Sequence, residues 1–139
     1  MYNKILLAVD GSDNSVRATK EAVKLASVNA SCVVNVLYVA DFAKAKQEVL
    51  HAQGKEELEL VRRRKLWPVE EQLKKHNLSY QVHILHGDPG PMIVEYANKE
   101  AFDLVVIGSR GLNAFQEMVL GSVSHKVVKR VKAPVLVVK

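Results

Sequence analysis

The sequence predicts an α/β fold in which one parallel sheet is covered by helices on both faces. Short apolar segments alternate along the chain with longer segments whose apolar residues recur at helical spacing. The segment at 104–107 is apolar throughout, as expected of a strand that is buried on both faces. The chain has 139 residues, 48% of them hydrophobic, which suits a single domain at 1–139 with a core of its own.

The N-terminal part of the chain predicts a strand, a helix and a second strand. Residues 4–9 form the first strand, and a turn follows it. A helix begins near Asp13, and 33–39 is a second buried strand. The helix has one apolar stripe, which consists of Val16, Thr19, Ala22, Val23 and Ala26.

The middle of the chain is less regular. The polar segment at 41–54 is predicted to be a loop with room for a short helix. A long helix follows at about 55–75 and contains Pro68, which should kink or restart it because proline lacks an amide hydrogen and crowds the preceding turn. The strand at 80–86 mixes polar and apolar residues, which is typical of an edge strand.

The C-terminal part predicts two helices and two strands. Asp88 is a favourable helix cap, and Pro89 suits the first position of the third helix. After the central strand at 104–107, a fourth helix ends at Ala133, and 135–138 is a short apolar strand. Five strands and four helices in alternation imply right-handed crossover connections.

Composition excludes several classes of protein. The net charge is +5, but acidic residues are mixed with the basic ones, so no nucleic-acid surface is predicted. No apolar run approaches the roughly 20 residues that a membrane-spanning helix needs. Asp10 lies where a signal peptide would continue its apolar region, so we expect a cytoplasmic protein. Cys32 is the single cysteine and reads as a buried strand residue, which agrees with a reducing compartment.

The five histidines do not predict a metal site or a catalytic base. His83 and His86 are three apart on a predicted strand, so their side chains should point to opposite faces. His125 lies near a glycine-rich segment. Its side chain could equally well face solvent or lie next to a bound phosphate. No catalytic residue is therefore assigned.

A spaced glycine motif follows the central strand. Gly108 and Gly111 are separated by two residues, Gly111 and Gly121 by nine, and Ser122 and Ser124 follow. Glycine permits positive φ and lets an anion approach backbone amides, while a helix opened by either serine would direct its positive end at the same anion. The motif predicts a phosphate site. A P-loop and a dinucleotide fingerprint are both absent from the sequence.

These glycines, the tail GSVSHKVVKRVKAPVLVVK and the opening KILLAVDGSDNS resemble the universal stress protein family, in its ATP-binding branch. The resemblance spans the whole chain. It implies a three-layer α/β/α sandwich of the Rossmann-like, adenine nucleotide alpha hydrolase-like type, with five parallel strands in the order 3-2-1-4-5. The winding of such a sheet switches between strands one and four, and Asp10 and Gly108 lie at their carboxyl ends.

The resemblance also implies roles for individual residues. Phosphates would be held by backbone amides and by the hydroxyls of Ser122 and Ser124. Asp10 would accept a hydrogen bond from a ribose hydroxyl or from the adenine edge, with a role as a turn residue that caps the first helix as the alternative. The phosphate-binding amides are those of Gly111, Gly121, Ser122 and Val123. The backbone of Val39 would read the adenine, and Ala8 would line the base pocket. The complete candidate set is Ala8, Asp10, Val39, Gly108, Ser109, Arg110, Gly111, Leu112, Asn113, Ala114, Gly121, Ser122, Val123 and Ser124.

Three functions are consistent with this pattern. The favoured one is an ATP-binding module of the stress response that changes shape or partners without rapid turnover. A slow ATPase or a nucleotidyl-transferring enzyme of the same fold is the alternative, although fold does not imply reaction. The third is an interaction protein with an empty site, against which the complete glycine motif argues. Mg²⁺ or Mn²⁺ can accompany ATP through its phosphates.

The last strand predicts a homodimer. If strand five is outermost, its apolar edge carries free amides and carbonyls, and pairing with the same strand of a second copy would satisfy them. The resemblance points to the same mode of association. The alternative is a strand covered by the chain's own helices. The residues concerned are Val135, Leu136, Val137 and Val138.

Overall fold

The computed structural model describes residues 1–40, 55–110 and 120–139, with side chains from residue 60 onward in the long helix. Nine elements lie in these ranges. In chain order they are β1 (Lys4–Val9), α1 (Asp13–Ala26), β2 (Val33–Ala40), α3 (Lys55–Lys75), β3 (Ser79–His86), α4 (Pro89–Glu100), β4 (Leu104–Gly108), α5 (Ser122–Arg130) and β5 (Val135–Val138).

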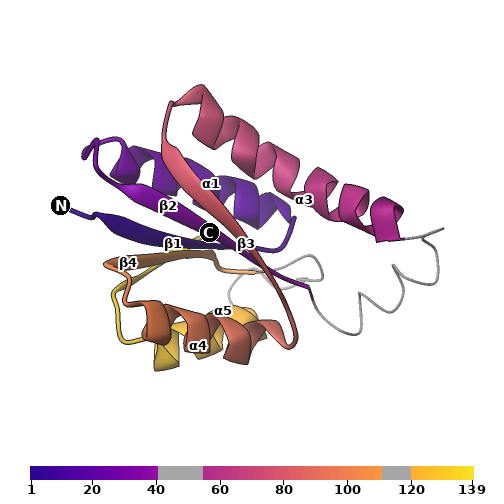
Figure 1. Cartoon of the computed structure of the whole chain (residues 1–139). Helices are drawn as coiled ribbons and strands as arrows, with labels where there is room; N and C mark the ends of the chain where they lie inside the picture. Colours follow the sequence, from indigo (N-terminus) through magenta and orange to yellow (C-terminus); the bar gives the residue numbers. More distant parts are fainter. Residues whose placement is uncertain (41–54, 111–119) are drawn as a thin grey trace.

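The five strands form one parallel sheet in the order β3-β2-β1-β4-β5. In the centre of the sheet, Leu7 of β1 lies between Val36 of β2 and Val106 of β4. Helices α1 and α3 lie on one face of the sheet, and α4 and α5 lie on the other (Figure 1). The predicted three-layer fold and its strand order are therefore confirmed.

Two cores follow from the alternation of side chains along the buried strands. Ile5, Leu7 and Val9 of β1 point to the α1–α3 face, whereas Leu6 and Ala8 point to the α4–α5 face. All five are at most 6% exposed. Because β1 is buried on both faces from Ile5 onward, that part of it must be apolar, which is why its sequence shows a continuous run after Lys4.

Several predicted boundaries agree with the structure and others differ. The strands at 4–9 and 135–138 are confirmed. Helix α3 continues through Pro68 as one element, so a restart is not observed. Helix α5 ends at Arg130, before the predicted Ala133, because Val131 already has extended backbone angles.

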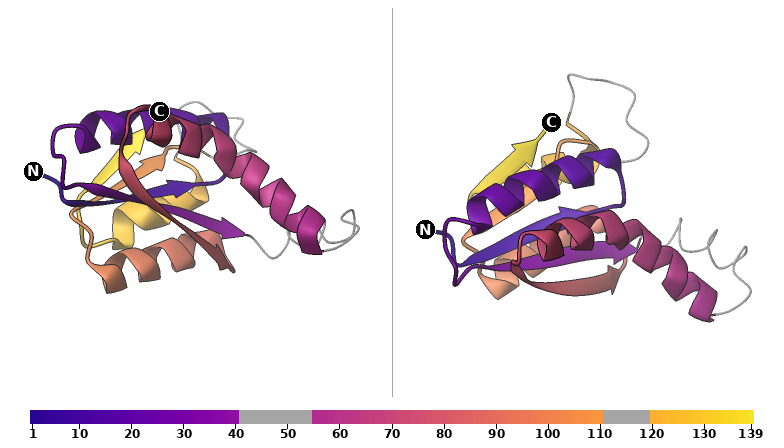
Figure 2. Two further views of the ribbon diagram at one scale, coloured as in Figure 1. Left: turned by 45° about the horizontal axis from the view of Figure 1, so that its top comes forward. Right: turned by 90° about the horizontal axis from the view of Figure 1, so that it is seen from above.

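The two edge strands of the sheet are β3 and β5 (Figure 2). The expectation of an edge strand at 80–86 is confirmed, and β5 is outermost as the dimer hypothesis requires. In the ranges given above, no helix combines the length and the apolar character needed to cross a lipid bilayer.

Candidate functional site

The candidate site lies at the carboxyl ends of β1 and β4, which are neighbours in the sheet. From β1 the chain proceeds to β2 on one side, and from β4 it proceeds to β5 on the other. The connections after these two strands leave in opposite directions, so a crevice is expected between them. Asp10 follows β1 directly, and Ser109 follows β4.

Asp10 is held in one orientation by the turn that it begins. Its Oδ1 atom accepts hydrogen bonds from the Ser12 amide at 2.9 Å and from the Ser15 hydroxyl at 2.8 Å. The Ser15 hydroxyl oxygen in turn accepts from the Asp10 amide at 2.9 Å. Gly11, which lies between Asp10 and Ser12, has a φ of +83, a value that glycine adopts readily. No residue in the described ranges donates to the Asp10 Oδ2 atom, which can therefore accept from a ligand.

The cap of α1 is Ser12 and not Asp10. The Ser12 side chain accepts from the Ser15 amide, as an N-cap residue does. The alternative interpretation of Asp10, as the residue that caps the first helix, is thus wrong in its detail. Asp10 instead stabilises the turn that precedes α1, by accepting from Ser12 and Ser15.

Gly108 is needed for packing. A Cβ atom at this position would lie 2.9 Å from the Cβ atom of Asn14 and 3.2 Å from its backbone oxygen. The first distance is shorter than real Cβ contacts and the second is tighter than most of them, and helix backbone cannot move aside as a flexible side chain can. Glycine at the end of β4 therefore allows the first turn of α1 to approach the strand.

Ser109 is the residue on which three elements converge. Its amide donates to the Val138 carbonyl oxygen of β5 at 2.8 Å, and its own carbonyl oxygen accepts from the Gly121 amide at 2.8 Å. Its hydroxyl oxygen accepts from the Asn14 side chain of α1 at 3.2 Å. Ser109 is 8% exposed, so these bonds lie in the interior, next to the carboxyl end of β4.

The first turn of α5 presents free backbone donors. The amides of Ser122, Val123 and Ser124 have no acceptor among the described residues, and the cap residue Gly121 has no side chain to supply one. The first turn also lacks an acidic residue. Three open N–H groups and the positive end of the helix dipole suit an anion.

Three expectations about this turn need correction. Gly121 has φ −61, so positive φ is not what this glycine provides. Its amide is already bonded to the Ser109 carbonyl oxygen, so it is not one of the open donors. The Ser124 hydroxyl donates to the Gly108 carbonyl oxygen at 2.6 Å, which directs its proton away from the crevice.

Ala8 and Val39 lie next to the carboxyl ends of β1 and β2. They are 4% and 8% exposed, and their side chains belong to the core on the α4–α5 face. Val39 is the last residue but one of β2, and the following residue, Ala40, accepts from the Gly87 amide at 3.0 Å. Both residues are thus at the carboxyl edge where the base was predicted to bind.

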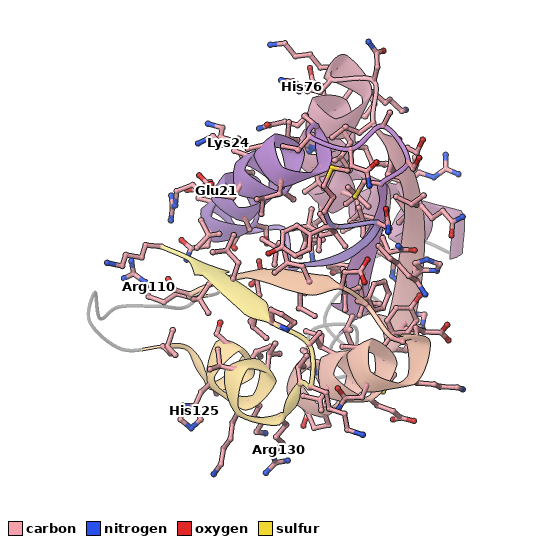
Figure 3. All side chains as sticks on the ribbon, turned by 90° about the vertical axis from the view of Figure 1, so that its left-hand side faces the viewer. Glu21, Lys24, His76, Arg110, His125 and Arg130 are labelled. Carbon is pink, nitrogen blue, oxygen red and sulfur yellow. The ribbon has the colours of Figure 1, made fainter. Side chains whose placement is uncertain are left out.

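Arg110 follows Ser109 and is half-buried at this edge of the sheet. Figure 3 labels it, together with His125 and Arg130, which project from α5 on the side away from the sheet. His125 is exposed. The four other members of the candidate set lie outside the described residues, and they are Gly111, Leu112, Asn113 and Ala114.

Asn14 is a residue at the site that sequence reasoning missed. It is 7% exposed and lies on the buried face of α1, at helical spacing from Ala18 and Ala22. A polar side chain on a buried face needs a specific partner, and that was the available signal. In the described part of the chain, no group of three metal-binding side chains occurs.

The chain and its structure were compared with known proteins. The model of the universal stress protein family matches residues 1–139. The chain is similar to universal stress protein YxiE of Bacillus subtilis, with 32% identity over 155 residues and 100% of both chains covered. The structure is similar to that of protein MJ0577 of Methanocaldococcus jannaschii, with a TM-score of 0.84, 31% identity, and 100% and 96% of the two chains covered. It is also similar to a universal stress protein in complex with cAMP, with a TM-score of 0.70, 25% identity, and 99% and 96% covered.

Proposed function

Because the chain belongs to the universal stress protein family, we propose that it is an ATP-binding regulatory module of the stress response. The first turn of α5 carries this proposal. Its three open amides and the exposed Ser122 lie at the switch point between β1 and β4, where an adenine nucleotide would place its phosphates. The similar protein that was solved with cAMP supports an adenine nucleotide as the ligand class.

Each described part of the site has a role in this proposal. The phosphates accept hydrogen bonds from the amides of Ser122, Val123 and Ser124. The oriented Asp10 carboxylate accepts from the ribose, since its Oδ2 atom has no donor in the described ranges. The adenine lies over the edge formed by Ala8 and Val39. A Mg²⁺ or Mn²⁺ ion would be held through the phosphate oxygens, because the described residues offer no cluster of ligands of their own.

We also propose a homodimer through β5. This strand is outermost, and Pro134 and Val138 direct their carbonyl oxygens to β4. Since N–H and C=O groups alternate in direction along a strand, those of Val135 and Val137 face outward. Pairing with β5 of a second copy would satisfy them. The single domain at 1–139 and the cytoplasmic location stay proposals that rest on the sequence.

Two measurements test the nucleotide proposal. Mass spectrometry of the ligand released from freshly purified, denatured protein should show an adenine nucleotide. Calorimetry should show tighter binding of ATP than of GTP, because fixed backbone groups near Val39 would read the base. Equal affinities, or no binding of either at millimolar nucleotide, would contradict the proposal. Phosphate release at a steady rate would instead favour the alternative of a slow ATPase.

A further inference from the structure

Asn14 connects α1 to the end of β4 by two kinds of contact. Its Nδ2 atom donates to the Ser109 hydroxyl oxygen at 3.2 Å, and both residues are less than 9% exposed. Its own Cβ atom packs directly against Gly108, since a Cβ atom on Gly108 would lie only 2.9 Å from it. The Asn14 side chain is therefore confined between the helix and the strand and can adopt few other orientations.

Arg17 determines which way the Asn14 amide points. One Nη atom of Arg17 donates to the Asn14 Oδ1 atom, and the Arg17 Nε atom donates to the Lys139 carbonyl oxygen at 2.9 Å. A guanidinium group only donates hydrogen bonds, so the atom that faces Arg17 must be the amide oxygen. The amide nitrogen must then face Ser109, which consequently accepts.

Ser109 in turn is bonded to the first turn of α5. Its carbonyl oxygen accepts from the amide of Gly121, the cap residue of that helix. A change in the orientation of Ser109 would therefore move the residue from which the three open amides follow. The chain of contacts from Arg17 through Asn14 and Ser109 to Gly121 ends at the anion-binding turn.

We propose that Asn14 is a positioning residue of the nucleotide site, which holds Ser109 and, through Ser109, the open amides of α5. Asn14 itself does not touch the nucleotide. The inference rests on the proposed function for its ligand, but the contacts that carry it exist without a ligand. Because the Ser109 amide is also bonded to Val138 of β5, the same residue joins the site to the edge strand.

The test compares two asparagines that each bridge separate elements. Asn14→Ala removes the donor to Ser109, and we expect about tenfold weaker ATP binding by calorimetry. Asn14→Asp keeps the size of the side chain and the contact to Arg17, and the Ser109 hydroxyl can donate to its carboxylate, so ATP binding should weaken less than in Asn14→Ala. Asn98→Ala is the control. Asn98 bonds to backbone atoms of Arg130 and Lys132 at the other end of α5, and its loss should leave ATP affinity within about twofold.

Hydrogen exchange in the absence of nucleotide supplies a second readout. In Asn14→Ala the amides of Ser109 and Gly121 should exchange faster than in the wild type, whereas in Asn98→Ala they should not. If the wild type binds ATP and Asn14→Ala binds it as tightly, the inference is overturned. If the wild type binds no nucleotide, the proposed function fails, and unchanged exchange at Gly121 in Asn14→Ala would overturn the inference separately.

Discussion

The hydroxyl group of Ser124 donates a 2.6 Å hydrogen bond to the backbone carbonyl oxygen of Gly108, and this bond ties the first turn of α5 to the end of β4. Ser124 is 4% exposed, whereas Ser122, two residues earlier on the same turn, is exposed. The two serines of the motif therefore differ in role. One stabilises the fold, and the other is available to a ligand.

Substitution of each serine by alanine should separate these roles. Ser124→Ala leaves a buried carbonyl oxygen without its donor, and we expect the free energy of unfolding to fall by about 1–3 kcal/mol. Ser122→Ala should change it by less than about 0.5 kcal/mol and should weaken ATP binding. Urea denaturation and calorimetry measure the two effects. Equal losses of stability in both variants would contradict this division.

Gly108→Ala should destabilise the protein by about 1–3 kcal/mol, because the added methyl group meets the backbone of α1 at Asn14. Gly90→Ala is the matched control. A Cβ atom there would also lie 2.9 Å from a neighbour, but that neighbour is the Cδ atom of the flexible Lys126 side chain. Gly90 lies in α4, so alanine should be neutral or stabilising by up to about 1 kcal/mol. The difference between the two unfolding curves checks the prediction, and similar curves would refute it.

The sequence predicted those parts of the fold that depend on local pattern. Strands β1 and β5 are continuous apolar runs, and α1 begins where Ser12 and Asp13 make a favourable first turn. The strand order came from the family resemblance and not from any local signal. Side chains at 104–107 are buried as the apolar run predicts.

The details of the site depend on contacts between distant residues, which no local pattern contains. Asn14 acquires its role from Ser109, 95 positions later. Gly108 reads as a ligand-binding glycine, yet it also has to be a glycine because of α1. The sequence predicts that the Gly121 amide is free to bind phosphate, but this amide donates to the Ser109 carbonyl oxygen. In each case a tertiary partner decides what the residue does.

The edge of β5 can be tested through its backbone. Val135 and Val137 pack their side chains on the core at the α4–α5 face, so charged substitutions there would disturb the fold as well as the edge. Val137→Pro removes an outward-facing N–H group, and we expect a folded protein that no longer dimerises, as measured by light scattering.

Leu136→Pro is the control for this variant. The Leu136 N–H group faces β4, so its loss should lower the free energy of unfolding more than the loss at Val137 does. If Val137→Pro folds and stays dimeric, β5 does not form the dimer interface. A wild-type protein that is monomeric in light scattering would also contradict the proposed dimer.

Cys32 should make the protein less stable at alkaline pH. Burial, and to a smaller degree the negative charge of Asp103, raise the pKa of its thiol above the ordinary value of 9.0. Above that value the unfolded chain loses the proton while the folded chain keeps it, so the free energy of unfolding falls as pH rises. The pKa values of Tyr80 and Tyr96 are also raised, mainly by burial, and act in the same direction.

Urea denaturation between about pH 8 and about pH 10 measures this dependence. Cys32→Ala should show a shallower decline than the wild type, with the remaining decline due to the tyrosines. Parallel curves for the two proteins would show that the thiol makes no contribution.

The pairing of β1 with β4 joins two segments that lie far apart in the sequence. The Asp103 carboxylate accepts from the amides of Asn3 and Lys4, which lie 100 and 99 positions earlier. During synthesis at about 5–20 residues per second, β1 therefore waits on the order of ten seconds before its neighbour exists. Through that interval one edge of β1, a strand buried on both faces, is unpaired, and the switch point has only one of its two sides. A nucleotide bound at the switch point, as proposed, would stabilise the finished protein and would not guide the early steps by which the chain folds.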